Sequence, residues 1–196
     1  MTQTSFNNVS IRLMSGGHSF SSADIEAARN ASQPVVVNLI SAKTTLVPAE
    51  LFDKEHAIDY LHDVGLYPAH NECVVYSKEN EGIVAVMAIN AECYKQLQEA
   101  ATHGLSFIMP LMEEYEEMYK GCAIHLEGDV LYVYINDNGL RFAEVMECTT
   151  DADVLYYLTK IGEAYNFNNM YARATGDTKR LLPLTKHLFK DIVCEL

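Results

Sequence analysis

The side chains in this sequence that could bind a metal ion or attack a substrate are seven histidines, five cysteines and scattered serines. No two histidines have His-x-x-x-His spacing and no two cysteines have Cys-x-x-Cys spacing, so no zinc site is predicted. The sequence also lacks a Gly-x-Ser-x-Gly motif, a Gly-x-x-x-x-Gly-Lys phosphate loop and a dinucleotide-binding glycine motif. We therefore expect no catalytic residue and no metal ligand, and the residues favour a protein that is not an enzyme.

One acidic cluster stands out, the segment Glu113-Glu114-Tyr115-Glu116-Glu117. On a helix, its four carboxylates would lie within about one and a half turns, where they could hold a divalent cation or a basic partner. The other interpretation is the solvated start of a helix, which is the more common role of such runs. The sequence leaves both open.

The sequence contains twelve tyrosines and no tryptophan. Tyr132 and Tyr134 alternate with Leu131, Val133 and Ile135 in one predicted strand, so that both faces of this strand present large side chains. Burial in a core or between lobes is the expected role of these two tyrosines. An aromatic patch for a protein partner is the alternative.

The charge balance limits the classes of partner. The chain has 14 basic and 27 acidic residues and a formal net charge of -13, which repels nucleic acids and anionic membrane surfaces. The five cysteines are odd in number and widely spread, as is typical of free thiols in a reducing compartment. The first residues of the sequence lack the basic region and apolar run of an export signal, and no later apolar run reaches the roughly 18 residues of a membrane span. We expect a cytoplasmic protein that neither binds nucleic acid nor inserts into a membrane.

Strands and turns alternate at the start of the chain. Residues 10–14 are predicted to form a strand, Gly16-Gly17 a tight turn, and residues from Ser19 onward a second strand, because paired glycines supply the positive φ of a two-residue hairpin. The β-branched run 35–40 is typical of a buried third strand.

A helix is predicted from about Asp53, whose carboxylate can cap it, with Ile58, Leu61 and Leu66 facing a core. Further along, residues 72–76 and 82–89 are expected to form a hairpin. Asn90 is expected to cap the next helix, and residues 105–111 to form the last strand of this half.

The second half repeats this order in fewer residues. Strands are predicted at 121–126, 130–135 and 140–148, with a hairpin turn at Asn138-Gly139. Thr150 and Asp153 have the spacing of a capping box, so a helix begins there. A strand is predicted at 170–175, followed by a helix that begins either at Thr178 or at Pro183, because proline lacks the amide hydrogen that a helix interior needs. A closing strand at 191–196 completes the half.

Both halves therefore have three antiparallel strands followed by alternating helices and strands, which indicates a duplication. This is the order of the ribonuclease-H-like unit, and two such units in tandem give the actin-like ATPase architecture. We predict an α/β fold with a first lobe at 1–111 and a second lobe at 112–196. Three segments, 10–13, 45–53 and 150–158, resemble a bacterial family of unknown function whose fold is similar to a reduced actin-like ATPase.

This resemblance implies where a nucleotide would bind. Actin-like ATPases hold phosphates between two hairpins, which correspond here to Gly16-Gly17 and Gly128-Asp129, and they use a later glycine, here Gly176, beside the adenosine. Magnesium would require carboxylates at both hairpins. No acidic residue lies near Gly16 and Gly17, and Leu126 occupies the place of the second acid.

We therefore expect no cofactor, although ATP with magnesium stays an alternative. The first hypothesis is a non-catalytic actin-like-fold protein that acts through protein contacts, with a different protein or with further copies of itself. The second is a nucleotide-binding protein or slow ATPase that uses the cleft between the lobes. Ordinary turn chemistry accounts equally well for these glycines.

Overall fold

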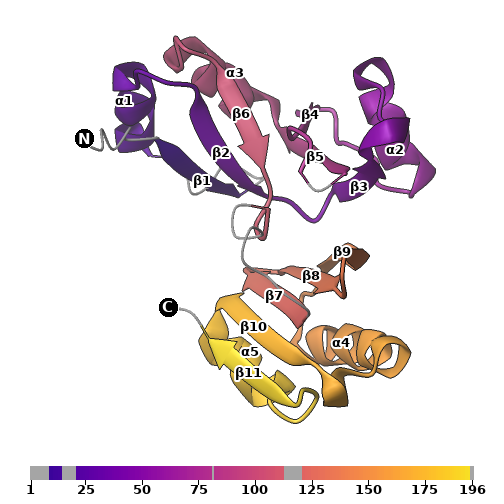
Figure 1. Ribbon diagram of the computed structural model, residues 1–196. Coiled ribbons are helices and arrows are strands. Elements are labelled where there is room, and N and C mark those ends of the chain that lie inside the picture. Colours follow the sequence, from indigo (N-terminus) through magenta and orange to yellow (C-terminus); the bar gives the residue numbers. More distant parts are fainter. Residues whose placement is uncertain (1–8, 15–20, 81, 113–120, 195–196) are drawn as a thin grey trace, which may run out of the picture. The chain divides into compact units, whose positions relative to one another are not determined.

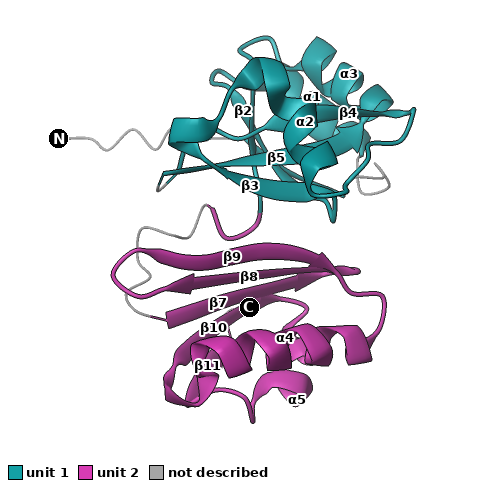
Figure 2. Cartoon of the chain, turned by 90° about the vertical axis from the view of Figure 1, so that its right-hand side faces the viewer, with its two compact units in different colours: residues 1–109 teal, residues 110–196 magenta. Residues whose placement is uncertain are grey.

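The computed structural model describes residues 9–14, 21–80, 82–112 and 121–194. The chain divides into two compact units, residues 1–109 and residues 110–196 (Figure 2). Each unit contains helices and β-sheet and is described separately below.

The first sheet of unit 1 is entirely parallel. It contains β1 (Ser10–Met14), β2 (Val35–Ile40) and β6 (Leu105–Ile108) in the order β1-β2-β6 (Figure 1). Helix α1 (Ser22–Asn30) connects β1 to β2, as a parallel pair requires, because adjacent parallel strands cannot be joined by a short turn.

The predicted antiparallel hairpin at the start of the chain is therefore wrong. Residues 22–30 form α1 instead of a second strand, and β1 pairs with β2 in parallel. The physical reason is a capping box: the Asp24 backbone N–H donates to Ser21 Oγ (3.3 Å), and the Ser21 backbone N–H donates to Asp24 Oδ2 (2.8 Å). Gly16 and Gly17 lie outside the described residues.

The second sheet of unit 1 is antiparallel. It contains β3 (Thr44–Pro48), β4 (Glu72–Tyr76) and β5 (Ile83–Asn90) in the order β3-β5-β4. The predicted hairpin between β4 and β5 is confirmed. The central strand, β5, is buried from Ile83 to Ile89, as expected for a strand covered on both faces. A single parallel bridge between Ser77 and Phe107 joins this sheet to β6.

The helical elements between β3 and β4 are two 3-10 turns, η1 (Ala49–Leu51) and η2 (Lys54–His56), and helix α2 (Ala57–Asp63). Asp53 caps this segment as predicted, with its Oδ1 accepting the Glu55 N–H at 2.9 Å. Leu61 is fully buried against β3 and β5, but Ile58 is 44% exposed, so the prediction that Ile58 faces the core is wrong. The helix is shorter than predicted, and only one side of it contacts the sheet.

Helix α3 (Ala91–Ala100) follows β5 directly and leads to β6. Asn90 caps it as predicted, with Oδ1 accepting the N–H groups of Glu92 (3.0 Å) and Cys93 (3.1 Å). Gly104 then adopts φ +94°, and β6 begins at the next residue.

Unit 2 has a single mixed sheet. It contains β7 (Gly121–Glu127), β8 (Val130–Asn136), β9 (Leu140–Glu147), β10 (Tyr171–Gly176) and β11 (Asp191–Cys194) in the order β11-β10-β7-β8-β9. The first three strands of the unit are antiparallel neighbours, and β10 and β11 extend the sheet in parallel with β7. The predicted strands of this half are confirmed.

Helices α4 (Asp151–Tyr165) and α5 (Thr178–Thr185) lie on one face of this sheet (Figure 2), with the 3-10 turn η4 (Phe167–Asn169) after α4. Thr150 and Asp153 form the predicted capping box. Helix α5 begins at Thr178, not at Pro183, because Asp177 Oδ1 accepts the Arg180 N–H (3.1 Å) and caps it there. The core between sheet and helices includes Ile124, Leu126, Leu131, Val133, Leu158, Ile161, Phe167 and Leu181.

Candidate functional site

The structure brings together three of the predicted site residues at one end of unit 2. Gly128 and Asp129 form the turn between β7 and β8, and Gly176 ends β10 opposite Leu126 of β7. Gly128 and Gly176 both have positive φ, +56° and +77°. The two strand ends are adjacent because β7 and β10 pair in parallel from Cys122 to Leu126.

Gly176 lies at a close contact between β10 and β7 of unit 2. A Cβ added at this position would lie 2.1 Å from the Leu126 carbonyl oxygen, which no real side chain tolerates. The Asp177 N–H donates to this same oxygen at 2.7 Å. The glycine is therefore required by the close approach of β10 to β7, and its conformation needs no ligand to explain it.

Arg180 of α5 closes the β7–β8 turn. Its Nη1 donates to the Gly128 carbonyl oxygen at 3.0 Å, and its Nε donates to Asp151 Oδ1 at 2.6 Å. The hydrogen bond to Asp151 raises the pKa of Arg180 above its ordinary value. One guanidinium thus ties together the turn, the first residue of α4 and the start of α5.

The surroundings of this turn are acidic. Asp129, Asp151 and Asp177 all raise the pKa of Arg180, which places three carboxylates around a single cation. Asp153 caps α4 close by, and hydrogen bonds from Thr150 hold its pKa below the ordinary range. Such a set of charges repels phosphate groups, and the nearby arginine is already committed to its hydrogen bonds. Among the described residues, no three histidine, cysteine or acidic side chains are grouped to hold a metal ion.

A chain of polar side chains lies beneath this turn. His125 Nε2 is 3.2 Å from Glu127 Oε2, and His125 Nδ1 is 2.8 Å from Thr175 Oγ1. A carboxylate only accepts, so the Nε2–H of His125 donates to Glu127, and in the tautomer with the proton on Nε2 the ring accepts from the Thr175 hydroxyl at Nδ1. An acid, a histidine and a hydroxyl in this order resemble a nucleophilic triad. His125 and Thr175 are only 5% and 8% exposed, however, so that a substrate cannot reach the hydroxyl.

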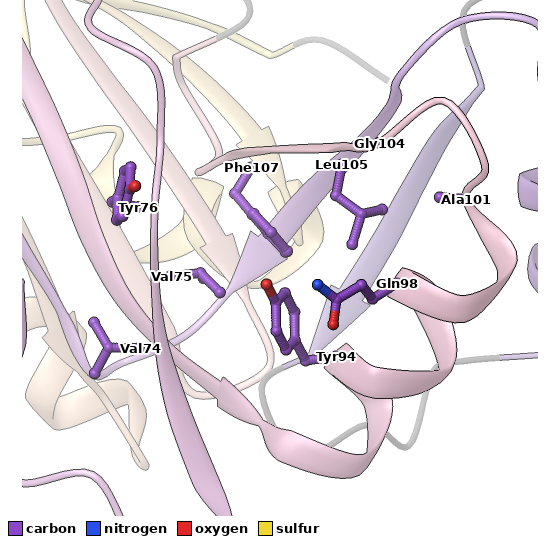
Figure 3. A pocket seen from close by; sticks show the side chains of 9 residues that line it. All are labelled: Val74, Val75, Tyr76, Tyr94, Gln98, Ala101, Gly104, Leu105 and Phe107. Atoms are coloured by element: carbon purple, nitrogen blue, oxygen red, sulfur yellow. The ribbon is translucent and has the colours of Figure 1, made fainter. Parts of the chain in front are cut away.

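Unit 1 contains a pocket that the sequence did not predict (Figure 3). It has a volume of about 310 Å³ and lies between β4 and β6, with α3 along one side. Its lining comes from these three elements and the turn before β6: Val74, Val75, Tyr76, Tyr94, Gln98, Ala101, Gly104, Leu105 and Phe107. Figure 3 shows Tyr94 and Gln98 reaching from α3 toward Phe107 and Leu105. This size and mixture of apolar and polar groups are typical of ligand sites.

The outer side of α2 forms an exposed apolar surface. Ile58 and His62 are one helical turn apart, and the Tyr67 ring lies 5.2 Å from the His62 ring. We name these three residues the outer row of α2. Ile58 is 44% exposed and Tyr67 is 65% exposed. Val64 and Leu51 in the same segment are 56% and 65% exposed and enlarge the exposed apolar area around α2.

Other predicted residues have a definite place or lie outside the described part. Tyr132 and Tyr134 are 1% and 2% exposed, so their expected burial is confirmed and they offer no aromatic surface. Residues 113–117, with the four glutamates, lie outside the described residues, as do Gly16 and Gly17. Among the described residues, no helix has the length and hydropathy that a membrane span requires.

Comparison with known families decides the membership of this chain. Residues 28–173 match the model of DUF3822, a family described as proteins of unknown function. The chain belongs to the DUF3822 family. The match includes the β7–β8 turn at Gly128 and the whole unit 1 pocket but ends before Gly176 and Arg180. The family resemblance predicted from the sequence is confirmed.

One solved structure shows the fold of this DUF3822 protein. A protein from Bacteroides thetaiotaomicron, described as having an actin-like ATPase fold and unknown function, is similar with a TM-score of 0.69 and 20% identity, covering 88% of this chain and 75% of that one. The cytoplasmic domain of EpsL, an inner membrane component of the type II secretion system of Vibrio cholerae, has a TM-score of 0.43 and 13% identity over 85% and 81% of the two chains. The second score is too low to support a conclusion. No curated protein matches the chain.

Proposed function

We propose that this protein is a non-catalytic member of the actin-like fold that acts by binding another protein through the outer row of α2. The observation that carries the proposal is the exposure of Ile58 on α2 and of Tyr67 shortly after this helix, next to the buried side of α2 at Ala57 and Leu61. Exposed apolar side chains that gather on one element are typical of protein contact surfaces. Asp59 and Asp63 are exposed on the same helix, which favours a partner with basic groups around an apolar centre.

The β7–β8 turn of unit 2, which Arg180 closes, supports a function that does not depend on nucleotide binding. The Gly128 carbonyl and the Gly176 backbone are both used by contacts within the unit, and three carboxylates surround the one arginine. A triphosphate would have to displace Arg180 and approach Asp129, Asp151 and Asp177. We therefore propose that neither ATP nor magnesium binds at this turn.

The finer architecture belongs to the same proposal. The order β9-β8-β7-β10-β11 in unit 2, with three antiparallel strands followed by two parallel ones, supports a ribonuclease-H-like unit. Unit 1 has a similar succession in space, with antiparallel β3-β5-β4 followed by parallel β6-β2-β1, but its chain visits these strands in a different order. We propose that the protein has two lobes of the actin-like type, the first with a rearranged chain path.

The compartment follows from the cysteines. All five are free thiols, and Cys122 and Cys148 are buried. Thiols that stay unpaired fit a reducing compartment, and we propose the cytoplasm.

Site-specific photo-crosslinking tests the proposed contact. With benzoylphenylalanine in place of Tyr67, we expect one discrete covalent adduct in the cells that naturally produce the protein. The same replacement at Tyr156, which is 59% exposed on α4, is the matched control and should give no adduct. Adding Ile58→Glu should reduce the adduct at least tenfold, because a carboxylate then lies inside the apolar contact.

The alternatives give different results. No adduct at position 67, or equal adducts at positions 67 and 156, would contradict the proposal. An adduct of about twice the chain mass of 22.0 kDa would identify a second copy of this chain and rule out a basic partner.

A further inference from the structure

The gap between β4 and β6 marks an interrupted sheet. Among the described residues, β4 pairs with β5 and β6 pairs with β2, and β4 and β6 meet only at the bridge between Ser77 and Phe107. The bridge lies directly after the last residue of β4 and at the third of the four residues of β6, and within the described part of the chain the two strands are not paired before it. The 310 Å³ pocket lies in this opening.

The backbone of β4 offers hydrogen-bonding groups to the opening. The Ser77 N–H donates to the Ala85 carbonyl at 2.9 Å, which places Ser77 on the side of β4 that faces β5. Because successive residues of an antiparallel strand point their N–H and C=O groups to opposite sides, Val74 and Tyr76 direct theirs away from β5. Val74 therefore presents one donor and one acceptor to the gap.

The backbone of β6 also offers hydrogen-bonding groups to the opening, from the side opposite β4. The Val35 N–H donates to the Gly104 carbonyl at 2.9 Å, so Gly104 and Ser106 face β2. Leu105, between them, directs its N–H and C=O toward β4. Among the described residues, no strand pairs with β4 at Val74 or with β6 at Leu105 on the sides that face the pocket, and the group that satisfies both is the main chain of another extended segment.

We propose that the slot between β4 and β6 binds an extended peptide segment of a basic partner protein, which adds as a strand next to Val74 and Leu105. The inference rests on the proposed function, because both assume that the ligand is a protein. The slot is a second contact surface, separate from the outer row of α2. Main-chain hydrogen bonds would supply affinity, and the pocket would select one side chain of the peptide.

The pocket favours an apolar anchor. Val75 and Phe107 are 5% and 7% exposed and form its apolar wall, and the Tyr94 ring lies 6.0 Å from the Phe107 ring. An aromatic or branched aliphatic side chain can pack against these groups. Gln98, which lines the pocket from the exposed side of α3, provides an amide for the peptide next to the anchor.

Charge favours a different protein over a second copy as the partner. Acidic residues outnumber basic ones 27 to 14 in this chain, so a second copy is repelled, whereas basic residues on either side of the anchor are attracted. The peptide is therefore expected to alternate basic and apolar residues, with the apolar anchor on the side that faces the pocket.

The test uses the full chain and fluorescein-labelled heptapeptides of the form Arg-Val-Arg-Xaa-Arg-Val-Arg, with Phe, Leu or Ala as the central residue. Fluorescence anisotropy should give affinities in the order Phe, Leu, Ala, with Phe at least tenfold tighter than Ala. N-methylation of alternate backbone amides in the Phe peptide keeps the side chains and removes the main-chain donors. We expect it to weaken binding at least tenfold.

Two protein variants locate the site. Gln98→Trp fills the pocket from an exposed position and should weaken binding at least tenfold, whereas Gln96→Trp on the same helix, outside the pocket, should leave it unchanged. Amide hydrogen exchange at Val74 and Leu105 should slow at least tenfold in the complex.

Several outcomes would overturn the inference. These are no binding of the Phe peptide at millimolar concentration, equal binding of the N-methylated peptide, unchanged exchange at Val74 and Leu105, or equal effects of the two tryptophan variants. None of them affects the crosslink at position 67, so a failure here is distinguishable from a failure of the proposed function. Absence of that crosslink with intact peptide binding would contradict the contact at the outer row of α2 and support the contact between β4 and β6.

Discussion

The two units differ at the same structural junction, where an antiparallel strand lies beside a parallel one. In unit 2, β7 and β10 pair over five residues, from Cys122 to Leu126. In unit 1, β4 and β6 meet at one bridge, and a pocket occupies the rest of the junction. The closed junction has a glycine, Gly176, that lets the strands approach, whereas Tyr94 and Gln98 of α3 line the open junction. The difference shows that such a junction is either closed by continuous backbone pairing, as in unit 2, or left open as a pocket, as in unit 1.

The largest effect is expected at the closed junction. Gly176→Ala would place a Cβ at 2.1 Å from the Leu126 carbonyl oxygen and force an alanine to φ +77°. We expect a loss of about 3 to 5 kcal/mol in the free energy of unfolding, from backbone strain and overpacking together. Urea denaturation measures this value.

Gly139→Ala is the matched control, because Gly139 also has positive φ, +122°, but no atom lies within 4 Å of its added Cβ. This variant should lose only about 1 to 3 kcal/mol in the free energy of unfolding, from backbone strain alone. Equal losses in the two variants would show that the contact between β10 and β7 is looser than described.

Replacing an alanine by valine should change the free energy of unfolding by a smaller amount, with opposite sign in the two units. Ala174→Val in the closed core of unit 2, where Ala174 is fully buried, should cost about 1 to 3 kcal/mol by overpacking. Ala101→Val adds two methyl groups at the wall of the open pocket and should increase stability by about 0.5 to 1 kcal/mol. A destabilising Ala101→Val would mean that the pocket has no room.

The smallest expected effect is the change in melting temperature when a nucleotide is added. Millimolar ATP with magnesium should leave the melting temperature unchanged, because the turn at Gly128 is closed by Arg180 and surrounded by carboxylates. A ligand at one hundred times its dissociation constant would add about 2.7 kcal/mol of stability, which a thermal-shift assay detects easily. A clear rise in melting temperature would restore the nucleotide hypothesis and weaken the contrast between the two units.

Local signals explain how well the second half could be predicted. Asn138-Gly139 and the Thr150–Asp153 capping box act within a few residues, and both predicted features are confirmed. The prediction for the start of the chain is wrong because it rests on the glycine pair at 16–17, whereas the signal that decides the structure is the capping box of Ser21 and Asp24. This capping box indicates helix α1, and a helix at this place favours parallel pairing of the strands before and after it.

The site was predicted only in part. Gly128, Asp129 and Gly176 were identified and do lie together, but Arg180, which closes the turn, is 52 residues from Gly128 and gives no local signal. The His125–Thr175 contact spans 50 residues and was missed for the same reason. The pocket depends on β4 and β6 failing to pair, and the absence of a pairing leaves no pattern in a sequence.

The parallel sheet of unit 1 has a consequence for folding during synthesis. Strand β2 ends at residue 40, and its second neighbour, β6, begins at residue 105, so residues 41–104 must leave the ribosome before that edge of β2 is covered. Closing so long a loop carries an entropic cost that local contacts do not repay, which slows assembly. Until β6 arrives, the nascent chain carries a bare, β-branched edge, and this is where chaperones would be needed most.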